Sequence, residues 1–130
     1  MSRKMLIAGN WKMNGLRQDS ILRVQKLVTE LSKALDPPFE MLVCPPVTLL
    51  DTVGAIIRYS AIKLGAQDCH AAQSGAHTGN ISAEMLADMG CSHVIVGHSE
   101  RRTLFNESDA IVLKKTIKCQ EENVIPILCI

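Results

Sequence analysis

Residues 94–102, VIVGHSERR, place side chains capable of chemistry directly after an unbroken apolar run. The run reaches Gly97 and is followed by His98, Ser99 and Glu100. An imidazole can polarise a carbonyl group or transfer a proton, and a carboxylate can orient a neighbouring cation. A strand that ends in a polar surface loop gives the same pattern, so the meaning of these residues depends on the elements that position them.

Two other apolar runs end in comparable residues. The residues at or just beyond their ends are Asn10, Lys12, Gln67 and Asp68. An amine, an amide, an imidazole and a carboxylate at one edge of a sheet would suit a small polar or anionic substrate. Taken alone, Lys12 is a typical surface lysine and His98 a typical loop histidine. A joint role therefore requires that the strands bring their ends together.

The chain alternates between apolar runs and segments of helical period. The expected strands cover residues 5–10, 39–44, 62–67, 92–97 and 124–130. The expected helices cover residues 16–35, the segment after Pro45-Pro46 from Leu49 to Ile57, the segment between Ser82 and Gly90, and a segment that begins at Ser108-Asp109. Because the strands are apolar along their length, both of their faces are expected to be buried in a parallel sheet.

Two architectures fit this order of elements: an open doubly wound sheet and part of a (β/α)8 barrel. Neither GxGxxG nor GxxxxGK[ST] follows any strand, which removes support for the nucleotide-binding versions. In both architectures the site is expected at the carboxyl ends of the strands. The side chains expected to face the core are Ile21, Val24, Leu27, Val28, Leu31 and Leu35 in the first helix and Ile111, Val112, Leu113 and Ile117 in the last.

The composition narrows the class of protein. With 47% hydrophobic and 21% charged residues, the chain is typical of a globular domain. A formal net charge of +1 without a basic stripe argues against a nucleic-acid partner. Arg3 and Lys4 precede only MLIAG, which is too short for a signal peptide or a membrane span. We therefore expect a cytoplasmic protein that does not contact a membrane.

The cysteines predict reduced thiols and no metal site. The five residues are Cys44, Cys69, Cys91, Cys119 and Cys129. They form no CxxC pair, and an odd number in a cytoplasmic chain favours buried free thiols. The spacing of Cys69, His70 and His77 fits no standard zinc pattern, so these residues are not expected to bind a metal ion.

Four stretches, in order along the chain, resemble one enzyme family. AGNWKMN at 8–14 and VIVGHSERR at 94–102 are similar to the two signature stretches of triosephosphate isomerase. GAQDCH at 65–70 and SGAHTG at 74–79 resemble its third strand and its interface loop. The resemblance implies a (β/α)8 barrel that is normally a homodimer. It also implies interconversion of dihydroxyacetone phosphate and D-glyceraldehyde 3-phosphate, in glycolysis and gluconeogenesis, without a cofactor.

The length of the chain limits how much of such a barrel it can form. A barrel of this type needs about 250 residues and eight strands. We therefore expect residues 1–130 to form the N-terminal part of a barrel domain. This part would contain strands one to five and four intervening helices, and it would lack strands six to eight.

The resemblance assigns roles to the residues at the strand ends. Lys12 resembles the lysine that binds the substrate and balances the charge of its phosphate and enediolate, and Asn10 resembles the amide beside the substrate oxygen. His98 resembles the imidazole that polarises the carbonyl group and moves protons between the two oxygens. Glu100, with Ser99 beside it, resembles the acid that supports the lysine. Triosephosphate isomerase is itself a standard example of a helix N-terminus that keeps this histidine neutral, and SERRTLF is the segment in which such a helix would form here.

The resemblance also predicts a dimer interface. Thr78 resembles the loop residue that reaches into the partner's site, and His77 and Gly79 flank it in the same interface. Asn80 stands where the family usually has an acid, so a cross-subunit ion pair is not expected from that position.

The family's catalytic base has no counterpart in these 130 residues. That base is a glutamate after the sixth strand, and the lid and the phosphate-binding amides also come from later segments. Removal of a carbon-bound proton requires a carboxylate and stabilisation of the developing oxyanion. The acids Glu100, Glu107, Glu121 and Glu122 do not occupy a matching position. The isolated chain is therefore expected to be inactive, and the alternatives are a non-catalytic half-barrel module for assembly or binding and a different phosphate-sugar enzyme of the barrel class.

Overall fold

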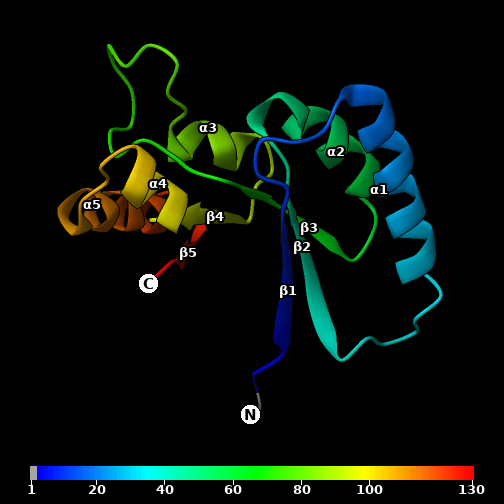
Figure 1. Cartoon of the computed structure of the whole chain (residues 1–130). Helices are drawn as coiled ribbons and strands as arrows, with labels where there is room; N and C mark the ends of the chain where they lie inside the picture. The colour runs from blue at the N-terminus through cyan, green and yellow to red at the C-terminus, as the bar shows by residue number, and fades with distance from the viewer. Residues whose placement is uncertain (1–2) are drawn as a thin grey trace. The chain divides into compact units, whose positions relative to one another are not determined.

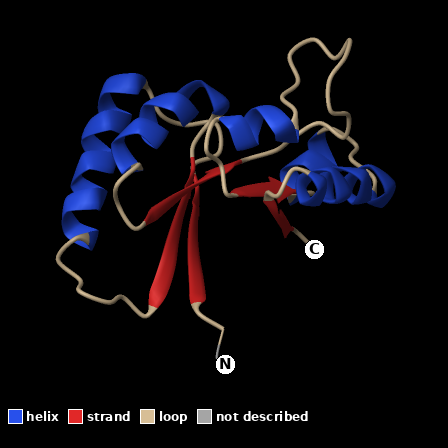
Figure 2. Cartoon of the chain, turned by 180° about the vertical axis from the view of Figure 1, so that it is seen from behind, coloured by secondary structure: helices blue, strands red, loops and turns tan. Residues whose placement is uncertain are grey.

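The computed structural model describes residues 3–130, in which helices and strands alternate (Figures 1 and 2). The elements in chain order are β1 (Met5–Asn10), α1 (Arg17–Leu31), β2 (Phe39–Cys44), the 3-10 helix η1 (Val47–Leu49), α2 (Leu50–Ile57), β3 (Ile62–Ala66), α3 (Ala83–Asp88), β4 (His93–Val96), α4 (Ser99–Leu104), α5 (Asp109–Glu121) and β5 (Ile125–Leu128). They group into two compact units, Met1–Gly65 and Ala66–Ile130.

The first unit contains three parallel strands, the α-helices α1 and α2 and the 3-10 helix η1. β1 pairs with β2 along its whole length, with Asn10 opposite Cys44, and β2 pairs in turn with β3. α1 and α2 contact one another. The side chains that are fully buried in this unit include Val24, Leu42, Cys44, Leu50 and Val53. The parallel pairing predicted from the alternation of strands and helices is confirmed here.

The second unit contains the parallel pair β4 and β5 with α3, α4 and α5. β4 is buried along its length, and its register places Val96 opposite Leu128. Serine side chains begin two of the helices, because Ser82 Oγ accepts the N–H of Met85 and Ser108 Oγ accepts the N–H of Ile111. Both caps occur where the sequence predicts a helix start. The segment SERRTLF forms the short helix α4.

The inward faces of the helices differ in part from the prediction. α1 ends at Leu31, and Leu35 lies in the following turn with its side chain exposed. The buried side chains of α5 are Val112, Lys115 and Cys119, whereas Ile111, Leu113 and Ile117 are exposed. The prediction is confirmed for Val112 and was wrong for Ile111, Leu113 and Ile117, because it assumed that only apolar residues face inward. A lysine with carboxylate partners occupies that face instead.

β1 and β5 are the exceptions to the expected burial of the strands. Met5, Leu6 and Ile7 of β1 are exposed, as are Ile125 and Leu128 of β5. β1 pairs with β2 and β5 pairs with β4, so each of these strands has a neighbouring strand on one edge.

Within residues 3–130, no helix is both long enough and apolar enough to cross a membrane.

Candidate active site

Asn10 and Lys12 lie where β1 turns into the following loop, in the first unit. The side-chain Oδ1 of Asn10 accepts a hydrogen bond from the backbone N–H of Lys12 at 3.0 Å. Lys12 has a φ of +55°, in the left-handed region that a residue with a Cβ adopts at a cost of about 1–3 kcal/mol. An uncommon backbone conformation at a loop lysine is a frequent feature of functional sites. The turn presents the Lys12 side chain at the surface of this unit.

Local contacts hold the rest of this loop. The N–H of Trp11 donates to Cys44 O at 3.1 Å, and Asn14 Nδ2 donates to Trp11 O at 2.8 Å. Gly15 has a φ of +111°, and a Cβ there would lie 3.0 Å from both a Leu49 methyl carbon and Ser20 Oγ. The loop is therefore held by contacts within it and by its packing against Cys44, Leu49 and Ser20.

A cavity of about 490 Å³ lies beside the same loop. Its lining residues are Trp11, Asn14, Gly15, Leu16, Asp19 and Arg23. Asn10 and Lys12 are not among them, so the cavity is not assigned to the substrate.

His98 caps the N-terminus of α4, in the second unit. Its Nδ1 accepts a hydrogen bond from the backbone N–H of Glu100 at 3.1 Å. An imidazole nitrogen that accepts a hydrogen bond carries no proton, so the proton of the neutral ring is on Nε2. Glu100 Oε2 lies 3.5 Å from the same Nδ1, and in this tautomer that approach is not a hydrogen bond. The geometry therefore gives His98 a free donor at Nε2.

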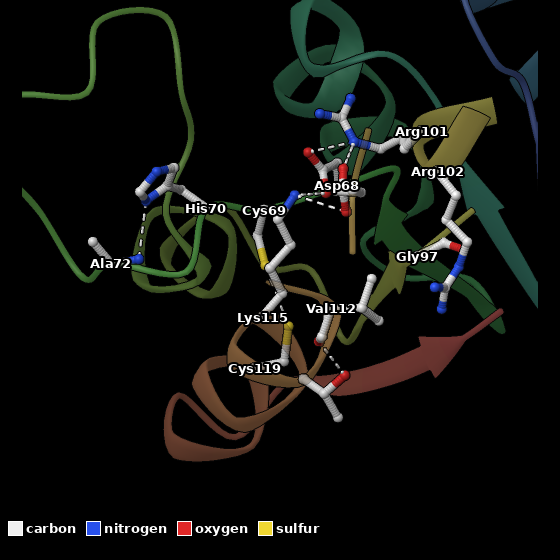
Figure 3. A network of polar contacts seen from close by, with 12 residues as sticks. Asp68, Cys69, His70, Ala72, Gly97, Arg101, Arg102, Val112, Lys115 and Cys119 are labelled. Atoms are coloured by element: carbon white, nitrogen blue, oxygen red, sulfur yellow. Dashed lines mark hydrogen bonds and ion pairs between the residues drawn. The ribbon is translucent and has the colours of Figure 1, made fainter. Parts of the chain in front are cut away.

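The residues around His98 fix its position. Gly97 has a φ of +70°, and a Cβ at this position would lie 2.8 Å from Val112 Cγ1. Arg102 Nε donates to Gly97 O at 2.8 Å (Figure 3). Arg102 Nη2 donates to Cys129 O at 3.2 Å. Gly97 and Arg102 thus stabilise the conformation of the chain at the end of β4. Ser99 is exposed in the first turn of α4.

A cluster of four charged side chains lies behind this segment, and sequence reasoning largely missed it. Lys115 Nζ is 2.8 Å from Asp68 Oδ1, and Arg101 Nε is 3.0 Å from Asp68 Oδ2 (Figure 3). Glu107 contacts both cations, with Oε2 2.5 Å from Arg101 Nε and Oε1 3.1 Å from Lys115 Nζ. Of these four residues, only Asp68 was proposed as a site residue. The other three were not proposed, because no pattern in the sequence places Lys115 on the buried face of α5.

The cluster perturbs both carboxylates, in opposite directions. Burial raises the pKa of Asp68, and the contacts with Lys115 and Arg101 only partly offset this effect. Burial also acts to raise the pKa of Glu107, but the hydrogen bond from Arg101 and the contact with Lys115 outweigh it, so this pKa lies below its ordinary value. Two cations facing two carboxylates make the cluster neutral as a whole, which is the condition for burying such groups. We infer that the cluster stabilises the positions of α4 and of the segment that contains Asp68.

The loop between β3 and α3 is closed at its base and extended at its tip (Figure 1). The N–H of His70 donates to Ile81 O at 2.8 Å, and the rings of His70 and His77 stack with their centroids 4.0 Å apart. Thr78 and Gly79 are exposed at the tip. The resemblance predicts an interface loop here, and the structure shows a loop with hydrogen bonds of its own.

The stacked histidines predict that this loop responds to pH. Burial, His77 and Lys115 all lower the pKa of His70 from its ordinary value of 6.5, and Asp68 opposes them. The folded loop thus binds fewer protons than the unfolded loop, so its stability falls as the pH drops through 6.5 toward the lower folded value. We expect an NMR titration of His70 to give a pKa below 6.5, and His77→Asn to bring it closer to 6.5. An unperturbed titration, or one that is the same in both proteins, would contradict this prediction.

Among the described residues, no group of three or more His, Cys, Asp or Glu side chains is arranged to hold a metal ion.

The predicted site residues divide between the two units. Asn10 and Lys12 belong to the first, and His98, Ser99 and Glu100 belong to the second, as do His77, Thr78 and Gly79.

Parallel strands that alternate with helices, and that carry polar residues after their carboxyl ends, define an α/β protein with its candidate site at the ends of the strands. The family model for triosephosphate isomerase matches residues 5–130, and the chain belongs to that family.

Known relatives agree with this assignment and show how much of the family fold is covered. The triosephosphate isomerase of Xanthobacter autotrophicus is 49% identical over 129 residues, which are 99% of this chain and 50% of that protein. The Aquifex aeolicus enzyme is 43% identical over 98% of this chain and 51% of its own length. The crystal structure of the Bartonella henselae enzyme superposes with a TM-score of 0.88 at 43% identity, covering 98% of this chain and 52% of that one. This chain thus has the fold of the N-terminal part of a (β/α)8 barrel and spans about half the length of the curated relatives it matches.

Proposed function

We propose that this chain carries the lysine and histidine side of a triosephosphate isomerase active site. The whole protein would interconvert dihydroxyacetone phosphate and D-glyceraldehyde 3-phosphate. The observation that carries the proposal is the hydrogen bond from the Glu100 N–H to Nδ1 of His98, because it leaves a neutral Nε2–H donor after β4. Barrel enzymes bind their substrates at this end of the strands. The family match over residues 5–130 supports the same reaction.

In the proposed reaction His98 and Lys12 stabilise charge, and a carboxylate outside this chain removes the proton. Loss of a proton from the carbon beside the carbonyl group shifts negative charge onto the carbonyl oxygen. The Nε2–H of His98 donates to that oxygen, and the ammonium of Lys12 balances the charge of the oxygen and of the phosphate. His98 then transfers the proton of the neighbouring hydroxyl group to this oxygen, and return of the carbon-bound proton to the adjacent carbon converts ketose to aldose. Because only protons change place, the reaction needs no cofactor.

Residues 1–130 alone are expected not to isomerise triose phosphates above the rate in buffer. The proposed base, lid and phosphate-binding loops all lie outside this segment, and a proton-transfer reaction without its base loses its main pathway. A coupled assay that follows the formation of D-glyceraldehyde 3-phosphate measures this directly. Turnover by the isolated chain that disappears on His98→Gln would show that it contains a base of its own, and would overturn this part of the proposal.

His98→Gln tests the proposed role of the imidazole in a competent enzyme. A suitable protein is a chimera that joins residues 1–130 to the C-terminal half of the Xanthobacter autotrophicus relative. The substitution should lower kcat by about a hundredfold and change KM much less, because a donor aimed at a developing oxyanion acts mainly in the transition state. Steady-state kinetics with both triose phosphates separate the two constants. An effect confined to KM would mean that His98 only binds substrate.

We also propose that the whole protein is a cytoplasmic, glycolytic homodimer that uses the loop tip at His77, Thr78 and Gly79. The exposed tip and the hydrogen-bonded base of the loop support this role. A loop already ordered before association loses less conformational entropy when it binds. Sedimentation of the whole protein and of a Thr78→Arg variant would test the assignment, with dissociation expected in the variant.

One observation favours a second candidate, a half-barrel module for assembly or binding. Met5, Leu6 and Ile7 of β1 are exposed, and exposed apolar strands promote association with other chains. Such a module would associate without isomerising triose phosphates. Size-exclusion chromatography, combined with the assay of the chimera, separates the two functions. A chimera that folds and remains inactive would favour the module.

A further inference from the structure

Two cysteine thiols meet inside the second unit, apart from the residues proposed for the isomerase site. Cys69 follows β3, and Cys119 lies near the C-terminal end of α5 (Figure 3). Their sulfur atoms are 3.5 Å apart, although the residues are 50 positions apart in the chain. Their exposed fractions are 2% and 0%. The two thiols therefore face each other in a space that excludes solvent.

An ion pair holds the two segments together next to the thiols. Lys115 stands one turn before Cys119 on α5, and Asp68 directly precedes Cys69. The 2.8 Å contact between Lys115 Nζ and Asp68 Oδ1 thus ties the same helix to the same segment. The sulfur atoms need to approach by only about 1.5 Å to reach the length of a disulfide bond. The ion pair therefore keeps the two thiols opposite each other.

We propose that Cys69 and Cys119 form a redox-active dithiol that closes into an intramolecular disulfide on reaction with a hydroperoxide. The first step joins the Cys119 sulfur to one oxygen of hydrogen peroxide and breaks the O–O bond. It gives a sulfenic acid and releases the other oxygen as water. In the second step the Cys69 sulfur attacks the Cys119 sulfur, the S–S bond forms and the S–O bond breaks. The hydroxyl group leaves as a second water with the Cys69 proton.

The environment of the pair assigns the two roles. The hydrogen bond between the two thiols lowers the pKa of Cys119, against the effect of burial. The same hydrogen bond, together with burial, raises the pKa of Cys69. Because the thiolate is the nucleophile, Cys119 reacts with the peroxide and Cys69 resolves the sulfenic acid. Burial makes the first step slow compared with that of an exposed thiol of equal acidity.

Cys91 provides a matched control in the same unit. It is also buried, with 6% of its surface exposed. Burial alone raises its pKa to about 11, so it lacks the effect that acidifies Cys119. If burial and chemical type decided reactivity, Cys91 and Cys119 would oxidise alike. If the contact between the two thiols decides reactivity, Cys69 and Cys119 should be oxidised and Cys91 should not.

The experiment treats the native chain with hydrogen peroxide, blocks the remaining thiols with an alkylating reagent, and maps the peptides by mass spectrometry. The expected product is a chain lighter by two hydrogens, with a Cys69–Cys119 linked peptide that dithiothreitol releases. Cys91→Ser should leave this peptide unchanged. In Cys69→Ser, a sulfenic acid trapped by dimedone should accumulate at Cys119 and at least threefold less at Cys91.

Three results would overturn the proposal. The first is native wild-type chain in which both thiols remain alkylatable after peroxide treatment. The second is a linked peptide that forms in urea but not in the native chain. The third is a preferred linkage to another cysteine or between two chains. None of these readings depends on the folding of a variant, since each is made on the wild-type protein.

Discussion

Replacing Lys12 with alanine is expected to lower kcat/KM for dihydroxyacetone phosphate by about a hundredfold to a thousandfold in the chimera with the Xanthobacter autotrophicus C-terminal half. The substitution removes the only charge at the turn after β1 that is proposed to balance the phosphate and the enediolate. A contact of a cation with an oxyanion contributes several kcal/mol, and about 1.4 kcal/mol corresponds to tenfold in rate. Lys12 is proposed to bind the phosphate of the substrate, so its loss should raise KM. It is also proposed to balance the charge that develops on the enediolate in the transition state, so its loss should lower kcat as well.

Lys26→Ala is the matched control for this experiment. Lys26 is an exposed lysine of α1 in the same unit, so the substitution removes an equal charge at a distance from the turn. Its kcat/KM should stay within about twofold of the parent chimera. If Lys12→Ala behaves like Lys26→Ala while the chimera is active, the assignment of Lys12 is wrong even though the family membership stands. Circular dichroism of both variants excludes unfolding as the cause.

Much of the fold follows from apolar runs and from cap residues. The expected strand at residues 39–44 coincides with β2, and Ser82 and Ser108 cap the helices that follow them. These features depend on local chemistry. An apolar strand needs only burial, and a serine at a helix start needs only the N–H three residues later. Local signals of this kind can be read from one sequence.

The candidate site residues were predicted for a different reason. Asn10, Lys12 and His98 follow apolar strands, and the parallel topology predicts that such ends carry the site. Their roles came from the resemblance of two stretches to a family. The tautomer of His98 required the structure, because it depends on which nitrogen meets the Glu100 N–H. No spacing in the sequence specifies that contact.

The buried charge cluster marks the limit of the sequence analysis. Periodicity predicts Ile111, Leu113 and Ile117 as core residues and does not include Lys115 among them, whereas in the structure Lys115 is buried and the other three are exposed. The burial of Lys115 depends on Asp68, which lies 47 positions away in the chain, and on Glu107, which lies between α4 and α5. A lysine is buried only where partners far along the chain are already in place. Pairings of this kind are set by tertiary structure.

Replacing Lys115 with methionine is expected to lower the free energy of unfolding of the chimera by about 3–5 kcal/mol. Methionine fills a similar volume, so the main loss is the charge. Without Lys115, the carboxylates of Asp68 and Glu107 share a single cation, Arg101, and one negative charge is left uncompensated at a site where the Glu107 side chain is only 5% exposed. Urea unfolding at pH 7.5 measures the change in the free energy of unfolding. The control is Lys114→Met, since Lys114 is an exposed neighbour on the same helix, and this substitution should change the free energy of unfolding by less than about 0.5 kcal/mol.

The pH dependence of the Lys115→Met variant separates lost charge from lost packing. Burial already raises the pKa of Asp68 in the native cluster, and loss of the lysine should raise it further. A carboxyl group whose folded pKa lies above its unfolded value binds its proton more tightly in the folded state, so stability falls as the pH rises through that window. The deficit of the variant should therefore shrink on acidification toward the unfolded value of 3.8. Adding Asp68→Asn removes the surplus charge and should recover more than half of the loss at pH 7.5. A deficit that neither acidification nor Asp68→Asn reduces would mean that Lys115 stabilises the fold through the packing of its side chain.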